Sequence, residues 1–176
     1  MKFIDYNTEN AAYWDQVYVD AFPETERFAM NFLLNQQATH SNIHLSIIER
    51  DDEYVGICLH VGIDTGKAFI LYLAIDAKMR GKNVGSEVLQ HLKKMYPNGY
   101  ILESEQTGLD AANEEQRVKR VQFYERNGLM DSRYLSHNQS GSFHVMRSND
   151  QVTMEDYLTG ISDLGIESAV DNRLLI

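Results

Sequence analysis

The residues with the clearest chemical potential lie in the basic stretch 78–86, which reads KMRGKNVGS. It follows the apolar run Phe69–Ile75 and precedes residues with helical spacing, so we expect it to join a strand to the start of a helix. The first amides of a helix lack intrahelical acceptors, and the helix dipole adds partial positive charge beside them. These amides and three cations, Lys78, Arg80 and Lys82, favour a phosphate-bearing ligand in a chain whose formal net charge is -10.

Two common nucleotide-binding motifs are excluded by the glycines of this stretch. A P-loop needs a Lys-Ser/Thr pair after a longer glycine-rich segment, and the dinucleotide fingerprint needs three glycines. The stretch has only Gly81 and Gly85. An ordinary strand-to-helix turn with surface cations is the alternative to a ligand site.

Two motifs in the chain resemble the signatures of the GNAT N-acetyltransferases. The segment Arg80–Gly85 reads RGKNVG and resembles the family's acyl-CoA loop, Arg/Gln-x-x-Gly-x-Gly/Ala, with Asn83 where glycine is usual. Asn is the non-glycine residue that best tolerates positive φ, so we expect the loop to keep its shape. Residues 120–129 read RVQFYERNGL and resemble the second signature, a helix ending in Phe-Tyr-x-x-x-Gly-Phe, with Leu129 as the last residue. The resemblance spans residues 44–147 and keeps the family's order of motifs.

The resemblance implies a fold and a co-substrate. The fold would be mixed α/β (α+β), with a mostly antiparallel sheet of six to seven strands flanked by helices. Acetyl-CoA would lie in a splay between two strands, its pantetheine pairing with the backbone of Leu73, Ala74 and Ile75. Its pyrophosphate would bind a loop made of Arg80, Gly81, Lys82, Asn83, Val84, Gly85 and Ser86. The implied reaction is direct attack of a primary amine on the thioester, and it requires no metal.

Tyr124 is the candidate general acid. It occupies the motif position where many members of the resembled family carry the tyrosine that protonates the coenzyme thiolate. The pKa of a free phenol, about 10, is well matched to a thiol leaving group. The alternative is that Tyr124 only packs beside Phe123 on its helix.

Glu103 and Glu105 are the candidate bases. They alternate with Leu102 and Ser104 in the segment 100–105, so both are expected on one face of a strand. Members of the resembled family often place a glutamate on this strand, where it acts directly or through water. A carboxylate near a partly dry cleft has a raised pKa, as a base needs. Glu103 is the first candidate and Glu105 the second; the alternative for each is contact with a cationic substrate or a solvated edge.

The composition limits the classes of partner and the cellular location that we expect. With 26 acidic against 16 basic residues, the chain is not expected to bind nucleic acid, because that affinity depends largely on neutralising phosphates. The acidic surface suits a cationic amine or serves solubility alone. No apolar run approaches the roughly 20 residues of a membrane span, and residues 1–6 lack the layout of a secretory signal. The single cysteine, Cys58, excludes an internal disulfide and fits a reducing cytoplasm.

Six histidines raise the question of a metal site. His40 and His44 flank a loop-like segment, and His137 and His144 could meet across a hairpin. Neither pair comes with a third ligand at diagnostic spacing, so no metal is expected.

Hydrophobic periodicity predicts the elements that position these residues. The expected order is a strand, two helices, three antiparallel strands, a helix, a strand, a helix and two strands. The corresponding segments are 1–6, 10–22, a helix from Pro23 through Leu33, 43–49, 54–63, a strand that ends at Ile75 after the turn 64–67, 84–95, 100–105, 113–127, 129–137 and 142–147.

The C-terminal segment is expected to be an addition to one domain. Residues 1–148 would form the acetyltransferase domain, and 149–176 a helical extension. Its helix would begin at Thr153 and end at Gly165. We expect it to pack on the domain or on a second copy of the chain, as in a homodimer.

Two alternatives to an enzyme stay open. A non-catalytic acyl-CoA-binding or sensing module would keep the fold without turnover, and Asn83 is its only support. An interaction protein would use the tail helix for assembly. The acceptor amine, a small molecule or a peptide, is not specified by any motif.

Overall fold

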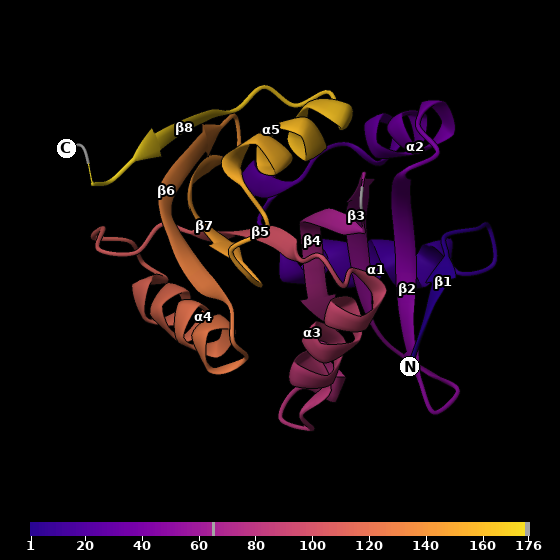
Figure 1. The fold of residues 1–176 in the computed structure, drawn as a ribbon. Helices are drawn as coiled ribbons and strands as arrows, with labels where there is room; N and C mark the ends of the chain where they lie inside the picture. The colour runs from indigo at the N-terminus through magenta and orange to yellow at the C-terminus, as the bar shows by residue number, and fades with distance from the viewer. Residues whose placement is uncertain (65, 175–176) are drawn as a thin grey trace.

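The computed structural model describes residues 1–64 and 66–174. Helices and strands are interspersed along the chain (Figure 1). Thr65, in a predicted turn, and residues 175–176, at the end of the predicted extension, lie outside the described residues. The elements are β1 (Lys2–Asp5), α1 (Ala11–Ala21), the 3-10 turn η1 (Glu24–Glu26), α2 (Met30–Thr39), β2 (Ile43–Arg50), β3 (Glu53–Ile63), β4 (Lys67–Ile75), the 3-10 turn η2 (Ala77–Met79), α3 (Val84–Met95), β5 (Tyr100–Glu105), α4 (Glu114–Arg126), β6 (Met130–Asn138), β7 (Gly141–Arg147), α5 (Met154–Asp163) and β8 (Ala169–Asn172).

The strands form one open sheet with the order β1-β2-β3-β4-β5-β7-β6-β8. Neighbouring strands are antiparallel except for β4 and β5, which are parallel. This topology confirms the predicted mixed α/β class with a mostly antiparallel sheet. The predicted strand number of six to seven is wrong, because the sheet already has eight strands within residues 1–64 and 66–174.

The strand missing from the prediction is β8, at the edge beyond β6. Its four residues, AVDN, carry no apolar run that would mark a strand in the sequence. Pairing with β6, from Tyr134↔Asn172 to His137↔Ala169, is what holds this segment extended. The C-terminal segment therefore contains a strand as well as the expected helix.

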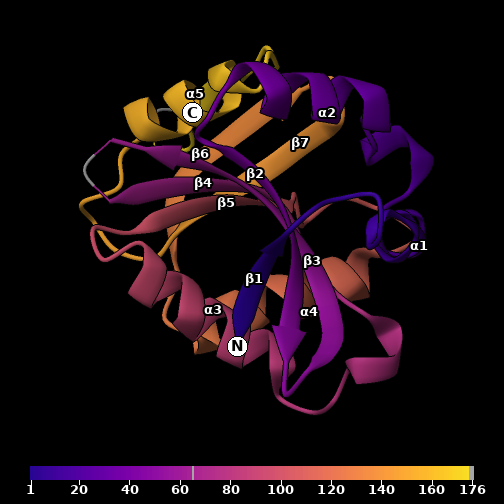
Figure 2. The ribbon, with the colours of Figure 1, turned by 90° about the vertical axis from the view of Figure 1, so that its right-hand side faces the viewer.

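Helices cover both faces of the sheet (Figure 2). On one face α1, α2 and α5 bury apolar residues that include Trp14, Leu33 and Tyr157. On the other face α3 and α4 bury a second cluster that includes Val88 and Tyr124. None of the described helices combines the length and the apolar character that a membrane crossing requires.

The parallel strands β4 and β5 part after a short paired stretch. Their register runs from Ala68↔Tyr100 to Ile70↔Leu102 and continues no further. At the next residue, Leu71, β4 carries an extra residue relative to β3, because the pairing of β3 passes from Ile70 directly to Tyr72. A bulge of this kind bends a strand and increases its twist. It lies where β4 turns away from β5, and the two strands splay apart beyond it.

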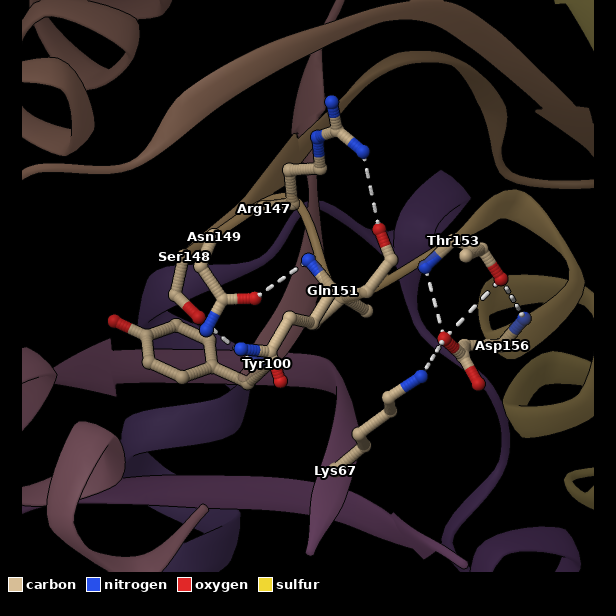
Figure 3. Close-up of polar contacts among 9 residues, drawn as sticks. Lys67, Tyr100, Arg147, Ser148, Asn149, Gln151, Thr153 and Asp156 are labelled. Carbon is tan, nitrogen blue, oxygen red and sulfur yellow. Dashed lines mark hydrogen bonds and ion pairs between the residues drawn. The ribbon is translucent and has the colours of Figure 1, made fainter. Parts of the chain in front are cut away.

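At the starts of β4 and β5, the ends away from the splay, polar contacts hold the two strands in place (Figure 3). Lys67 Nζ lies 2.8 Å from Asp156 Oδ2, which ties the start of β4 to the first turn of α5. The backbone N–H of Tyr100 donates to Ser148 Oγ at 2.8 Å. Thr153 and Asp156 form a reciprocal capping box at the start of α5. The strand pair is thus closed at one end and open at the other.

The segment after α1 differs from the prediction. A helix was expected to start at Pro23, but only the turn η1 forms there, and α2 begins at Met30. Tyr72 Oη donates to Glu26 O at 2.7 Å and accepts from the N–H of Phe28 at 3.3 Å. Tyr18 Oη donates to Phe28 O at 3.0 Å. These bonds from buried tyrosines engage backbone groups that a helix would use itself, so tertiary contacts override the local pattern.

Candidate active site

A cleft of about 1110 Å³ opens between the splayed ends of β4 and β5. Lys78 and Lys82 do not line it, but all the other residues that the sequence assigned to acyl-CoA binding or catalysis do: Leu73, Ala74, Ile75, Arg80, Gly81, Asn83, Val84, Gly85, Ser86, Glu103, Glu105 and Tyr124. The side chain of Lys82 lies in a neighbouring depression, with its Nζ 3.8 Å from the sulfur of Met79. The fold therefore gathers two distant motifs and one strand around a single space.

One side of the cleft, the loop arm, consists of Leu73–Ile75 of β4 and the loop Arg80–Ser86 that leads into α3. Gly81 has φ of 75° and Asn83 has φ of 62°, so the predicted left-handed asparagine is confirmed. Asn83 makes no side-chain cap hydrogen bond. The amide of Glu87 donates to Asn83 O at 3.2 Å, so the helical amides that precede it, of Val84, Gly85 and Ser86, have no acceptor within the helix.

The strand in the loop arm has one unpaired edge. On one side β4 pairs with β3 as far as Gly56↔Ile75. On the other side, within the described residues, no strand pairs with β4 beyond Ile70. Its free peptide groups can bond an extended ligand as an added strand would.

Gly85 allows α3 to start close to α4. A Cβ at this position would lie 2.9 Å from Phe123 Cζ and 3.8 Å from Ile75 Cγ1. A side chain here would therefore push against Phe123 and the end of β4. This close approach is a packing reason for the second glycine of the loop motif.

Tyr124 of α4 forms part of the cleft wall and is only 7 % exposed. Burial raises the pKa of Tyr124, and the nearby charge of Arg120 opposes that rise. The phenol is therefore protonated at neutral pH. Within the part of the chain that the structure describes, its hydroxyl has no hydrogen-bond partner, so it is free to donate to a ligand.

The other side of the cleft, the carboxylate arm, contains Glu103 and Glu105 of β5 and Glu26 of η1. Glu103 Oε1 accepts hydrogen bonds from Ser136 Oγ at 2.6 Å, Tyr157 Oη at 2.6 Å and Asn138 Nδ2 at 3.2 Å. Burial raises the pKa of Glu103, and these neutral donors oppose the rise.

Glu105 lies two residues along the strand in a different environment. It is 7 % exposed, and its carboxylate oxygens lie 2.6 Å from Arg120 Nη1 and 3.1 Å from Arg117 Nη2. Asn113 Nδ2 donates to it at 3.1 Å. Burial alone would raise the pKa of Glu105, but Asn113 and the two guanidinium groups outweigh it and hold the pKa below its ordinary value.

Glu26 is a cleft residue that the sequence reasoning missed. Glu26 and Glu105 line the same cleft. Burial and the charge of Glu105 raise the pKa of Glu26 to about 7, against the opposing charges of Arg120 and Arg117. No local signal separates Glu26 from Glu24, which is exposed on the same turn.

No metal site accompanies these groups in the described part of the chain. No three His, Cys, Asp or Glu side chains in residues 1–64 and 66–174 are placed to hold an ion together. Of the two histidines that could have met across the hairpin, His137 contacts Ser142 Oγ at 2.7 Å and His144 contacts Thr107 Oγ1 at 2.9 Å.

Comparison with known proteins relates this chain to acetyltransferases. The model of the family described as "Acetyltransferase (GNAT) family" matches residues 11–129. A GNAT-family acetyltransferase from Bacteroides thetaiotaomicron is 21% identical with a TM-score of 0.73, and the match covers 90% of this chain and 93% of that one. No curated protein sequence matches the chain at a significant level.

Two further solved structures of the same fold contain the coenzyme or its analogue. An aminoglycoside 6'-N-acetyltransferase complexed with coenzyme A is 15% identical with a TM-score of 0.58, covering 87% of this chain and 98% of that one. Arabidopsis thaliana Naa50 in complex with the bisubstrate analogue CoA-Ac-MVNAL is 18% identical with a TM-score of 0.57, covering 84% and 97%. At these identities the likeness establishes the fold.

Proposed function

Because the chain belongs to the acetyltransferase (GNAT) family, we propose that it transfers an acetyl group from acetyl-CoA to a primary amine within a ternary complex. The observation that carries the proposal is the cleft between β4 and β5. One side has backbone amides without intrahelical acceptors at the start of α3. The cleft wall also carries carboxylates and the Tyr124 hydroxyl.

The loop arm is the proposed site of acetyl-CoA. The pyrophosphate would accept hydrogen bonds from the amides of Val84, Gly85 and Ser86, with Arg80 beside it. The pantetheine would extend along the free edge of β4 at Leu73–Ile75. Lys82 would contribute only its backbone, since its side chain lies outside the cleft. Coenzyme A in the aminoglycoside acetyltransferase of the same fold supports this choice of co-substrate.

The chemistry follows from the groups around the splay. A neutral amine attacks the thioester carbonyl, the N–C bond forms, and the tetrahedral intermediate collapses with cleavage of the C–S bond. Tyr124 would donate its proton to the departing thiolate sulfur, and a carboxylate of the opposite arm would accept the proton from the amine. Among the residues singled out in the sequence, Glu103 suits the base role better than Glu105, because Glu105 is held ionised by two guanidinium groups.

Location and assembly are proposed from the sequence alone. One cysteine, Cys58, is buried and suits a reducing cytoplasm. We retain the homodimer as a prediction, to be checked by light scattering of the full chain.

The decisive experiment measures release of free thiol from acetyl-CoA over a panel of polyamines, aminoglycosides, amino acids and N-terminal peptides. We expect amine-dependent release that falls about 100-fold in Tyr124→Phe, in the range typical of a lost general acid. Tyr54→Phe is the matched control, because Tyr54 is exposed and lies outside the cleft.

Binding separates the remaining outcomes. If no amine is acetylated but calorimetry detects acetyl-CoA binding, the result favours an acceptor outside the panel or a non-catalytic acyl-CoA-binding module. If acetyl-CoA does not bind at all, the proposed function is wrong.

A further inference from the structure

The backbone around Glu26 is held in place by the core. Tyr72 Oη donates to the carbonyl oxygen of Glu26 at 2.7 Å, and Tyr72 itself is 4 % exposed. Tyr72 directly precedes Leu73 of the loop arm. Glu26 is therefore fixed relative to the strand on which the acyl group is proposed to lie.

The carboxyl of Glu26 shares its surroundings with that of Glu105. Both residues line the cleft, the charge of Glu105 opposes the ionisation of Glu26, and two adjacent carboxylates do not readily ionise together. Arg117, Arg120 and Asn113 all bond to Glu105, so the negative charge is favoured there. The last proton of the pair therefore resides on Glu26, and it is released near neutral pH.

We infer that Glu26 is the general base that accepts the proton of the acceptor amine, and that Glu105 is a positioning residue that keeps Glu26 poised for this transfer. The inference rests on the proposed acetyl transfer. The ionised Glu26 carboxylate takes one proton from the substrate ammonium, and the freed lone pair attacks the thioester carbon. The C–S bond then breaks, the sulfur takes the proton of Tyr124, and the nitrogen loses its second proton to water, which leaves a neutral amide and the free thiol. Exchange with water returns both side chains to their starting states.

The two strand glutamates are less suited to this step. Both oxygens of Glu105 are engaged by guanidinium groups. Glu103 Oε1 already accepts hydrogen bonds from Ser136 and Tyr157 at 2.6 Å each. Glu26 is the cleft carboxylate without a guanidinium or hydroxyl partner among the described residues. Burial and the charge of Glu105 raise its pKa, Arg120 and Arg117 oppose that rise, and the charge of Glu26 in turn acts on the nearby Tyr72 hydroxyl.

The test is the pH dependence of kcat at saturating acetyl-CoA and saturating amine, using the best acceptor from the panel. The wild type should gain activity as the pH rises through about 7, because Glu26 must be ionised to accept a proton. Glu26→Gln should lower kcat about 100-fold and abolish this acidic limb. Its affinity for acetyl-CoA, measured by calorimetry, should stay within about twofold because the loop arm is intact. Glu24→Gln, on the exposed side of the same turn, is the matched control and should behave as wild type.

Glu105→Gln tests the positioning role. Removing the like charge while Arg117 and Arg120 remain should move the acidic limb to lower pH, a change that mere loss of packing would not produce. If this variant does not fold, Arg120→Gln can be tested in its place. Loss of the cation should move the acidic limb of kcat to higher pH, the direction opposite to that expected for Glu105→Gln.

Three results would overturn the inference. An active enzyme whose Glu26→Gln variant keeps its acidic limb and most of its rate has another base. Loss of the limb in Glu103→Gln but not in Glu26→Gln assigns that role to Glu103. Wild-type protein that binds acetyl-CoA without acetylating any amine refutes the proposed function itself. The thiol-release assay of the wild type detects this outcome before any variant is compared, so it is distinct from failure of the Glu26 assignment.

Discussion

The two arms of the cleft are built in different ways. The loop arm is continuous in the sequence from Leu73 to Ser86, and its binding groups are mostly backbone amides and a free strand edge. The carboxylate arm brings together side chains from η1, β5 and α4 that are far apart in the chain, such as Glu26, Glu105 and Arg120. The loop arm would bind its ligand mainly through the geometry of its backbone. The carboxylate arm depends instead on how the charges of its side chains affect one another.

This difference separates the effects expected from mutation. Changes to the loop arm should appear in the affinity for acetyl-CoA, because they alter where the coenzyme can lie. Changes to the carboxylate arm should appear in the pH dependence and in stability, because they alter which group holds a proton. Two predictions concern the loop arm and two concern the carboxylate arm, and the expected effects decrease in that order.

Gly85→Leu should produce the largest effect, a loss of affinity for acetyl-CoA of about 100-fold, or about 2.7 kcal/mol. Its Cβ would lie 2.9 Å from Phe123 Cζ, so Phe123 must shift and the start of α3 must move from its place in the cleft. Isothermal calorimetry measures the loss. Gly81→Ala meets nothing within 4 Å and carries only the strain of its φ of 75°, about 1 kcal/mol, so its loss should be smaller. Equal losses would contradict the packing role of Gly85.

Arg80→Ala should weaken acetyl-CoA binding about tenfold, whereas Lys82→Ala should weaken it less than about threefold. Arg80 lines the cleft, and the side chain of Lys82 lies outside it. The two variants remove the same charge from the same loop, so each is the control for the other. Similar losses in calorimetry would mean that the number of cations, and not their placement, determines affinity.

Glu26→Gln should stabilise the protein at high pH. The pKa of Glu26 is about 7 in the fold against an ordinary 4.5, so the folded state binds the extra proton between these values. Stability is therefore lost as the pH rises through this range, and glutamine removes that loss. Because the side chain is partly exposed, we expect a gain of only about 1 kcal/mol above pH 7 and none below pH 4.5. Denaturant titration of both proteins at the two ends of the range measures it, and a pH-independent difference would contradict the charge coupling.

Arg120→Gln should have the smallest effect, a rise of about half a unit in the acidic limb of kcat and about a threefold loss of rate near neutral pH. Arg120 lowers the pKa of both Glu26 and Glu105, but its side chain is 41% exposed, so water screens part of its charge. Lys119→Gln is the control: Lys119 also borders the cleft, but it pairs with the exposed Glu115 and does not contribute to the pKa shifts of Glu26 and Glu105. A shift to lower pH would have the wrong sign for this arrangement.

The same contrast explains how much of the molecule could be predicted. The order of elements through β7 follows from periodicity, the left-handed Asn83 follows from local backbone preference, and the α/β class follows from the resemblance of the two motifs to a known family. The structure confirms all three. The start of α2 and the strand β8 were predicted incorrectly or missed. In both segments tertiary hydrogen bonds, from Tyr18 and Tyr72 or from β6, decide the backbone conformation.

The loop arm could be predicted from the sequence, because a strand, a glycine-containing turn and a helix start are set by residues that are neighbours in the chain. The sequence also named Tyr124, Glu103 and Glu105 as cleft residues, whose chemical roles are predictions. Packing of the sheet and helices brings Glu26 into the cleft and places Lys82 along a neighbouring depression, and neither could be predicted from the sequence. A pKa depends on burial and on charges within a few ångströms, and the chain brings Glu26, Glu105 and Arg120 to that distance only when its sheet and helices have packed.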